Sequence, residues 1–396
     1  MEPDNHQSLE FPAAADRSPA PEMRLASDQN AESLPPEPPQ THRIHRVFIG
    51  PDGLRAGWSV LLFVAIMAAV MIGIGLVLGA THLIDRKARF SFTPQNMFFN
   101  ELDMFVGLLG AAWAMARIER RNMLDYNLRG PRRPQHFFSG LVIGFAALSL
   151  LVGSLKAGGW LHFGAAALSG GAILKYATIW GAVFLMVGCV EEGTFRCYLQ
   201  YTFTRGINFW WALGINAALC ADLAARAKGN GVWGDYAIAL LGVIPCYILH
   251  RKAAPRSGFW QAAWTTSTLF GFVHTGNGGE TWIGIFSAAA IGFIFCVSIR
   301  VTGSAWWAIG AHAGWDWAET YFYGTADSGL TAKGHFLTTA PAGNPLWSGG
   351  TTGPEGSLLI LGILILLLLW LIVVYGRRSS AAQPVAALEP MVRDRQ

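Results

Sequence analysis

Two adjacent carboxylates and an arginine stand in the stretch VEEGTFR, directly after the apolar run IWGAVFLMVGC. A charge at the depth of a bilayer costs at least about 2.5–3.5 kcal/mol, so such residues are expected to have a function or a partner. On a helix, Glu192 and Arg196 are four residues apart and face each other, with the acid first, which favours an ion pair. Glu191 points about 100° away from that pair, because each residue of an α-helix turns by that angle. We therefore expect Glu191 to face a cavity, although a salt-bridge cluster at a helix end would use the same three residues.

Histidines stand in two further apolar segments. LFGFVH ends in His274, before the helix-ending TGNGG, and AHAGWDWAE carries His312 and Asp316 on one helical face. A histidine at a helix end and a His–Asp pair that links helices are both ordinary structural features. Groups so costly to bury nevertheless gain most by meeting around a wet cavity, where two hydrolytic mechanisms are open. Glu191 with His274 could deprotonate a water while His312 stabilises the oxyanion. Alternatively, Glu191, His274 and His312 could hold a zinc ion that activates the water.

The composition indicates the elements that must position these residues. The chain has 396 residues, of which 52% are hydrophobic and 14% charged, whereas soluble domains carry about 25% charged residues. Several runs approach the roughly 20 apolar residues that cross a bilayer, and backbone groups in lipid must be hydrogen-bonded within their own segment. We therefore predict an all-α, polytopic transmembrane helical bundle of about 8–10 membrane helices. The apolar segments are at about 56–83, 99–117, 137–155, 173–200, 208–224, 233–250, 258–275, 281–300, 303–323 and 356–376.

The polar stretches predict the domain organisation. Residues 1–50 are rich in Pro, Ser, Glu and Asp and are expected to be a disordered tail, as are residues 381–396. The transmembrane domain then covers 51–380. The Arg-rich loop RIERRNMLDYNLRGPRRP favours cytoplasmic termini, although RKAR at 86–89 opposes this orientation. We expect a multi-pass protein of the plasma membrane, with the long loop at about 324–355 on its outer face.

The three motifs resemble those of a known family. E-E-x-x-x-R, F-x-x-x-H and H-x-x-x-D, in this order on successive membrane helices, are similar to the motifs of the CPBP family of intramembrane proteases. That family includes CAAX prenyl endopeptidases and bacteriocin-processing and immunity proteins. The resemblance covers roughly residues 178–320 and implies a CPBP-like protease core at about 173–323. It also implies an endopeptidase that cuts a membrane-associated peptide. It makes Glu191 the residue that activates water, with His274 beside it, and makes Glu192 and Arg196 the structural pair.

The resemblance also implies that His312 and position 316 stabilise the tetrahedral intermediate, and at position 316 the sequence departs from the family. Position 316 is often Asn, which can donate a hydrogen bond to an oxyanion, whereas an ionised Asp cannot. Asp316 would therefore be protonated, orient His312 or bind a metal. In addition, about 80 residues separate the first motif from the second. We interpret the segments at about 208–250 as an inserted hairpin.

The family has been described both as metal-dependent and as a metal-free glutamate protease. The sequence lacks H-E-x-x-H, the usual zinc signature, which favours a glutamate-activated water that needs no cofactor; the zinc alternative would make the protein a metalloprotease. The expected partners are a membrane-associated peptide or protein substrate and the lipid bilayer, and the small net charge of +4 indicates no nucleic acid. The alternative function is a non-catalytic scaffold or immunity-type protein of the same family. A proton-coupled transporter is less favoured because we find no internal repeat.

Overall fold

The computed structural model describes residues 47–50, 53–81, 92–227, 233–252 and 256–376, which all belong to one unit that begins at Val47. The predicted tail at 381–396 lies outside the described residues, as do most of the predicted tail at 1–50 and the RKAR stretch.

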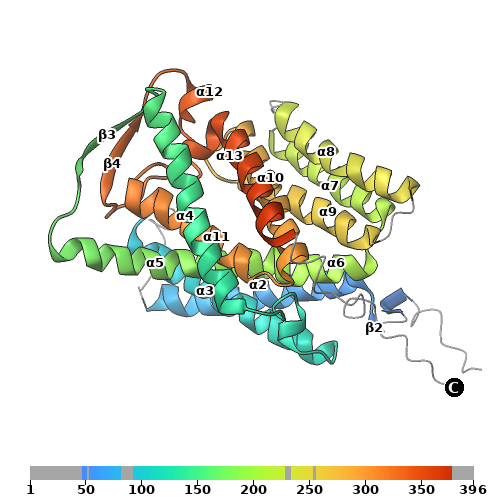
Figure 1. Cartoon of the computed structure of the whole chain (residues 1–396). Coiled ribbons are helices and arrows are strands. Elements are labelled where there is room, and N and C mark those ends of the chain that lie inside the picture. Colours follow the sequence, from blue (N-terminus) through green and yellow to red (C-terminus); the bar gives the residue numbers. More distant parts are fainter. Residues whose placement is uncertain (1–46, 51–52, 82–91, 228–232, 253–255, 377–396) are drawn as a thin grey trace, which may run out of the picture. The chain divides into compact units, whose positions relative to one another are not determined.

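Helices occur at all ten predicted segments, so the all-α fold class is confirmed (Figure 1). They are α2 (Ala56–Ala80), α3 (Pro94–Ile118), α4 (Arg133–Ala157), α5 (Gly171–Glu192), α7 (Phe209–Ala227), α8 (Trp233–Arg251), α9 (Ser257–His274), α10 (Trp282–Thr302), α11 (Trp306–Asp316) and α13 (Leu359–Leu371). Two short helices, α6 (Gln200–Gly206) and α12 (Pro345–Ser348), lie between them in the chain.

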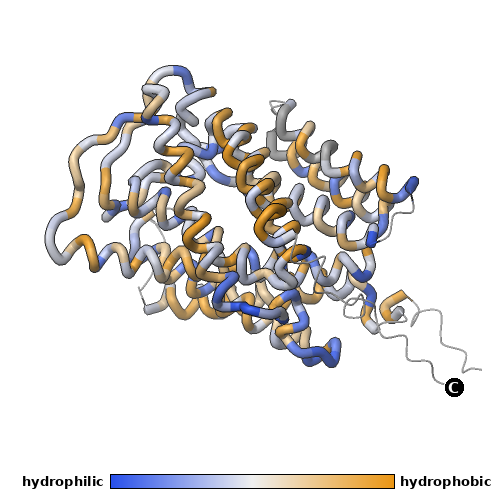
Figure 2. Tube along the Cα trace, viewed as in Figure 1, coloured by the Kyte–Doolittle hydropathy of each residue, from blue (hydrophilic) through white to orange (hydrophobic). Residues whose placement is uncertain are grey.

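Five helical ranges in the described part of the chain are long and apolar enough to cross a membrane. They are Ala56–Ala80, Arg133–Ala157, Gly171–Gly206, Trp282–Thr302 and Leu359–Gly376. The other predicted segments form helices that are shorter or more polar. Figure 2 shows mainly hydrophobic helices and a hydrophilic loop between α3 and α4, the Arg-rich loop of the sequence. The chain is therefore an integral membrane protein with a helical bundle.

Local sequence signals explain where the helices begin. Before α3, the hydroxyl of Thr93 accepts a hydrogen bond from the backbone N–H of Asn96, and Pro94 occupies the first helical position. Before α10, Thr281 caps the N–H of Gly284 in the same way. In the polar helix α9, Thr265 donates its hydroxyl to the carbonyl one turn earlier, so this side chain is satisfied although it is fully buried.

Helices α4 and α11 cross at very short range because glycines line the contact (Figure 1). Gly140 and Gly144 on α4 face Gly310 and Gly314 on α11, and a Cβ at any of the four would collide with a backbone carbonyl of the other helix. Small residues spaced by four let two membrane helices approach closely. His312 lies between the two glycines of α11, so this crossing determines where its ring can lie.

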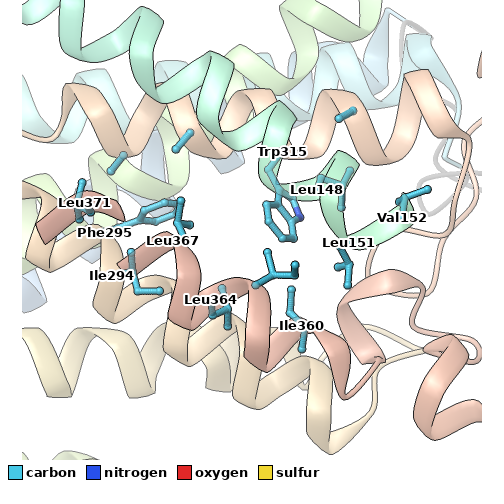
Figure 3. Packing of buried hydrophobic residues seen from close by; sticks show 14 of the residues in the cluster. Leu148, Leu151, Val152, Ile294, Phe295, Trp315, Ile360, Leu364, Leu367 and Leu371 are labelled. Atoms are coloured by element: carbon cyan, nitrogen blue, oxygen red, sulfur yellow. The ribbon is translucent and has the colours of Figure 1, made fainter. Parts of the chain in front are cut away.

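The main apolar core lies between α4, α10, α11 and α13 (Figure 3). Its buried members include Leu148, Leu151, Phe295, Trp315, Ile360, Leu364 and Leu367. Trp315 points from α11 into this core, beside residues of α4 and α13. The C-terminal helix α13 therefore supports the segment that carries the third motif.

The inserted hairpin predicted at about 208–250 is present as α7 and α8, which pack on α9 (Figure 1). Two strand pairs were not expected. β4 (Leu337–Pro341), inside the long loop at 324–355, pairs antiparallel with β3 (Leu161–Ala166), which follows α4. A second antiparallel pair, β1 (Ile49–Gly50) and β2 (Gly53–Leu54), precedes α2. The β3–β4 pairing holds the long loop at the end of α4.

Candidate active site

A cavity of about 200 Å³ lies among the helices that carry the three motifs. Residues from α3, α4, α5, α9, α10, α11 and α13 line it, together with residues of the long loop. Four of the predicted site residues, Glu191, His274, His312 and Asp316, are among the lining residues. The structure thus brings all three motifs to one cavity.

Both acidic motifs end regular helices. α5 ends at Glu192 and continues as a π-helix, η2 (Gly193–Leu199), and α11 ends at Asp316 and continues as a π-helix, η3 (Trp317–Tyr323). A π-helical segment changes the direction of the side chains that follow it, and such segments are frequent at functional sites. In this protein each change occurs directly after the carboxylates of a motif.

The predicted ion pair is present, and its acid has a second partner. Arg196 Nε lies 3.2 Å from Glu192 Oε2, and both side chains are fully buried. The other oxygen of Glu192 lies 2.8 Å from Nδ1 of His312, which donates because a carboxylate can only accept. Glu192 is therefore both the counter-ion of Arg196 and the group that orients His312, a link that the sequence did not reveal.

Aromatic rings surround the guanidinium of Arg196. Its central carbon lies 4.0 Å from the ring centroid of Phe270 and within 6 Å of those of Phe195 and Phe295. A cation over an aromatic face is stabilised by about 2 kcal/mol when water is excluded. Gly292 of α10 leaves room for this group, since a Cβ there would collide with the guanidinium. Arg196 is thus built into the bundle and does not line the cavity.

His274 is presented to the cavity in a defined tautomer. Its Nδ1 lies 2.8 Å from the carbonyl oxygen of Phe270, which can only accept, so Nδ1 carries the hydrogen. In the neutral ring, Nε2 is then an acceptor. Phe270 also contacts the ring of His274, with centroids 4.8 Å apart, so one residue supports both His274 and Arg196. Within the described residues, no hydrogen bond or ion pair joins His274 to Glu191.

The second nitrogen of His312 faces two carboxylates. Nε2 lies 3.4 Å from Asp316 Oδ2 and 3.7 Å from Glu191 Oε2. Glu191 is the more accessible of the two acids, with 30% of its side chain exposed against 13% for Asp316. The side chain expected to face a cavity therefore does so.

The donor arrangement gives no support to the alternative zinc site. Among the residues that the structure describes, no group of three His, Cys, Asp or Glu side chains is placed to hold a metal ion. Glu191, His274 and His312 share the cavity without converging on one point. We therefore derive no step through a metal.

Three carboxylates that the sequence analysis did not single out also line the cavity. They are Glu101 of α3, and Asp327 and Glu355 of the long loop. Glu101 is a carboxylate within an apolar segment, which is the signal that identified Glu191. It was missed because it stands only two residues inside the predicted segment at 99–117, where an interfacial position is ordinary. The loop acids carry no sequence signal, because only the β3–β4 pairing and the fold bring the loop to the cavity.

Burial changes the titration of the acids outside the helices. It raises the pKa of Glu355 to about 8 and that of Glu280, next to the cavity wall, to about 7, from an ordinary 4.5. Burial also raises the pKa of Asp327, whose Oδ2 accepts a hydrogen bond of 2.7 Å from the hydroxyl of Thr320. The charged form of each group lacks the water that would stabilise it.

A comparison with protein families agrees with the motifs. The model of the Rce1-like family, the type II CAAX prenyl endopeptidases, matches residues 246–318, which include His274, His312 and Asp316. No curated protein and no solved structure was found to match the chain. The matched residues contain the second and third motifs, and the structure joins them to the first motif through the bond between His312 and Glu192. Residues 246–318 are therefore similar to type II CAAX prenyl endopeptidases, which supports the resemblance of the three motifs to the CPBP family.

Proposed function

We propose that this protein is an intramembrane endopeptidase that hydrolyses a peptide bond in a CAAX-type C-terminal peptide, through a water activated by Glu191 and His274. The observation that carries the proposal is the single cavity that Glu191, His274 and His312 share although they come from three helices. Apolar residues of α10 and α13, including Ile291 and Leu364, line the same space. An apolar wall beside a few converging polar groups is typical of a binding site.

The proposed reaction consumes one water. Glu191 accepts a proton from the water while the acceptor nitrogen Nε2 of His274 orients it, and the water oxygen attacks the carbonyl carbon. The tetrahedral intermediate then breaks its C–N bond, and the proton held by Glu191 passes to the departing amine nitrogen. A carboxylate on the cavity wall with 30% exposure can meet both the water and the substrate.

His312 is proposed to stabilise the oxyanion. Its Nδ1–H is bonded to Glu192, so Nε2 can donate only when the ring carries two hydrogens. The Oδ2 of Asp316, 3.4 Å from Nε2, then shares this single N–H with the oxyanion and so fixes the direction of the ring, without donating to the oxyanion itself. Under this proposal Asp316 orients His312. This is one of the three roles that were open because Asp stands where the family often has Asn.

The proposed location is the plasma membrane, with both termini in the cytoplasm. The Arg-rich loop supports this orientation, since it joins α3 and α4 at the opposite end of α4 from β3. An epitope fused after Gln396 should be protected from external protease in intact cells, and its digestion there would reverse the orientation.

The test is peptidase activity of the detergent-purified protein on a library of prenylated C-terminal peptides. Wild type should cleave at least one peptide, and Glu191→Gln should lose about 10²-fold or more in rate, the lower range for one general base. Glu280→Gln is the matched control, because Glu280 is a partly buried carboxyl next to the cavity that does not line it. Cleavage by wild type should withstand a chelator. Loss on chelation with recovery in zinc would replace this mechanism, and normal turnover by a folded Glu191→Gln protein would remove Glu191 from it.

A further inference from the structure

The cavity carries an excess of acidic groups. Its lining contains five carboxylic acids, namely Glu101, Glu191, Asp316, Asp327 and Glu355, and two histidines. No Lys or Arg occurs among the described residues that line it. The proposed reaction uses Glu191 and Asp316, so three acids remain without a role.

Glu101 is the most informative of the three. It is 9% exposed and faces the cavity, yet no hydrogen bond or ion pair joins it to another described residue. It lies near enough to Glu191 and His312 to interact with both electrostatically. A buried carboxyl is normally paired or hydrogen-bonded, so one that faces a cavity without a partner in the protein indicates a ligand that supplies the partner.

The two loop acids have few donors of their own. The indole N–H of Trp315 is shared between Glu355, at 2.8 Å, and the buried Glu319, at 3.1 Å. Asp327 accepts one hydroxyl, from Thr320. Glu355 and Glu319 thus share one N–H, and Asp327 has one hydroxyl donor, so the loop acids can each accept further hydrogen bonds.

The chemistry of the site indicates an organic cation. No three of the described His, Cys, Asp and Glu side chains are placed around one metal position, so the acids do not form a metal site. An ammonium or guanidinium group carries several N–H donors, so it can fill the acceptor capacity of more than one carboxylate without the short, convergent oxygen distances that a metal ion needs.

We propose that three carboxylic acids, Glu101, Asp327 and Glu355, together form an acidic wall that binds a Lys or Arg side chain of the substrate peptide beside the bond that is cut. This inference rests on the proposed function for the ligand being a peptide. A cavity of about 200 Å³ holds few side chains, so the cation belongs to a residue adjacent to the cleaved bond. The acidic wall then separates peptides with a basic residue at that position from peptides that are apolar throughout.

The test measures binding separately from cleavage. The inactive variant Glu191→Gln is titrated with farnesylated C-terminal peptides that carry either Lys or norleucine at the first or the second residue after the cysteine. We expect the Lys peptide to bind about tenfold more tightly at one of the two positions, the order of one hydrogen bond to a charged group. Adding Glu101→Gln or Asp327→Asn should reduce that ratio to about two or less, while the norleucine peptide binds unchanged. Glu355→Gln gives a third, independent variant.

Glu280→Gln is the matched control, since it removes a partly buried carboxyl beside the acidic wall but outside the cavity lining. Equal binding of Lys and norleucine peptides at both positions would overturn the inference, as would a loss of preference in Glu280→Gln as large as in the wall variants. A Lys preference that depends on the wall, combined with no cleavage by the wild type, would support the inference and contradict the proposed peptidase.

Discussion

Replacing Arg196 by methionine should destabilise the protein by about 3–5 kcal/mol, the usual cost of removing one partner of a buried ion pair. Glu192 is fully buried, so without Arg196 its charge is left with the single N–H of His312. The contact of the guanidinium with Phe270, at 4.0 Å, is lost as well. These two losses place the expected value near the upper end of the range.

The double variant Glu192→Gln with Arg196→Met separates charge from packing. Removing both charges together leaves no uncompensated ion, so most of the lost stability should return. Activity should not return, because the amide oxygen of Gln is neutral and orients the N–H of His312 less strongly than a carboxylate. The melting temperature and the refolding yield in detergent measure the first effect, and peptide cleavage measures the second. Equal destabilisation by the double variant and by Arg196→Met would refute the argument that the cost comes from an unpaired buried charge.

Two further predictions follow from the same structure. Gly144→Val should place side-chain atoms against the backbone of α11 and so lower the stability of the protein by about 1–3 kcal/mol, as overpacking does. It should also reduce activity, because it displaces His312. Gly153→Val, on an open face of α4, is the control and should change neither stability nor activity. Thermal melts of these two variants test it, and equal melting temperatures would contradict the close α4–α11 contact. The pKa values of Glu280 and Glu355 are raised to about 7 and about 8, which means that the folded state favours the protonated forms of these two groups. Their contribution to stability is therefore complete below about pH 4.5 and is lost as the pH rises through 7–8. Wild type should therefore melt at a lower temperature at pH 9 than at pH 5, and the melting temperature of Glu355→Gln should depend less on pH. If the melting temperature of that variant changes with pH as much as that of the wild type, Glu355 does not contribute to the pH dependence.

The sequence predicted the helices well because each apolar segment has only one economical conformation in lipid. It also predicted the pair of Glu192 and Arg196, since i and i+4 residues of one helix meet whatever the rest of the fold does. The catalytic roles carried over from the family remain predictions. Local spacing predicts no contact between different helices. The hydrogen bond between Glu192 and His312, which are 120 residues apart in sequence, could therefore not be predicted.

Two missed features did carry readable signals. Gly140, Gly144, Gly310 and Gly314 form one G-x-x-x-G pattern in each of α4 and α11, which is the pattern of closely packed membrane helices. Glu101 is a carboxylate within an apolar segment. The π-helical segments had no such signal, because an apolar helix that shifts its hydrogen-bond pattern for one or two turns has the same composition as one that does not.

The order of the cavity walls along the chain has a consequence for biosynthesis. Glu191 is made before His274 and His312, and the last lining residue, Leu367, belongs to the C-terminal helix α13. A nascent chain that has inserted α5 into the membrane therefore carries the carboxylate without either histidine. A chain that ends before His312 lacks at least one of the groups that the proposed reaction uses, so under that proposal it cannot cut its neighbours in the membrane. The order of the motifs along the chain thus delays the proposed activity until both histidines have been made.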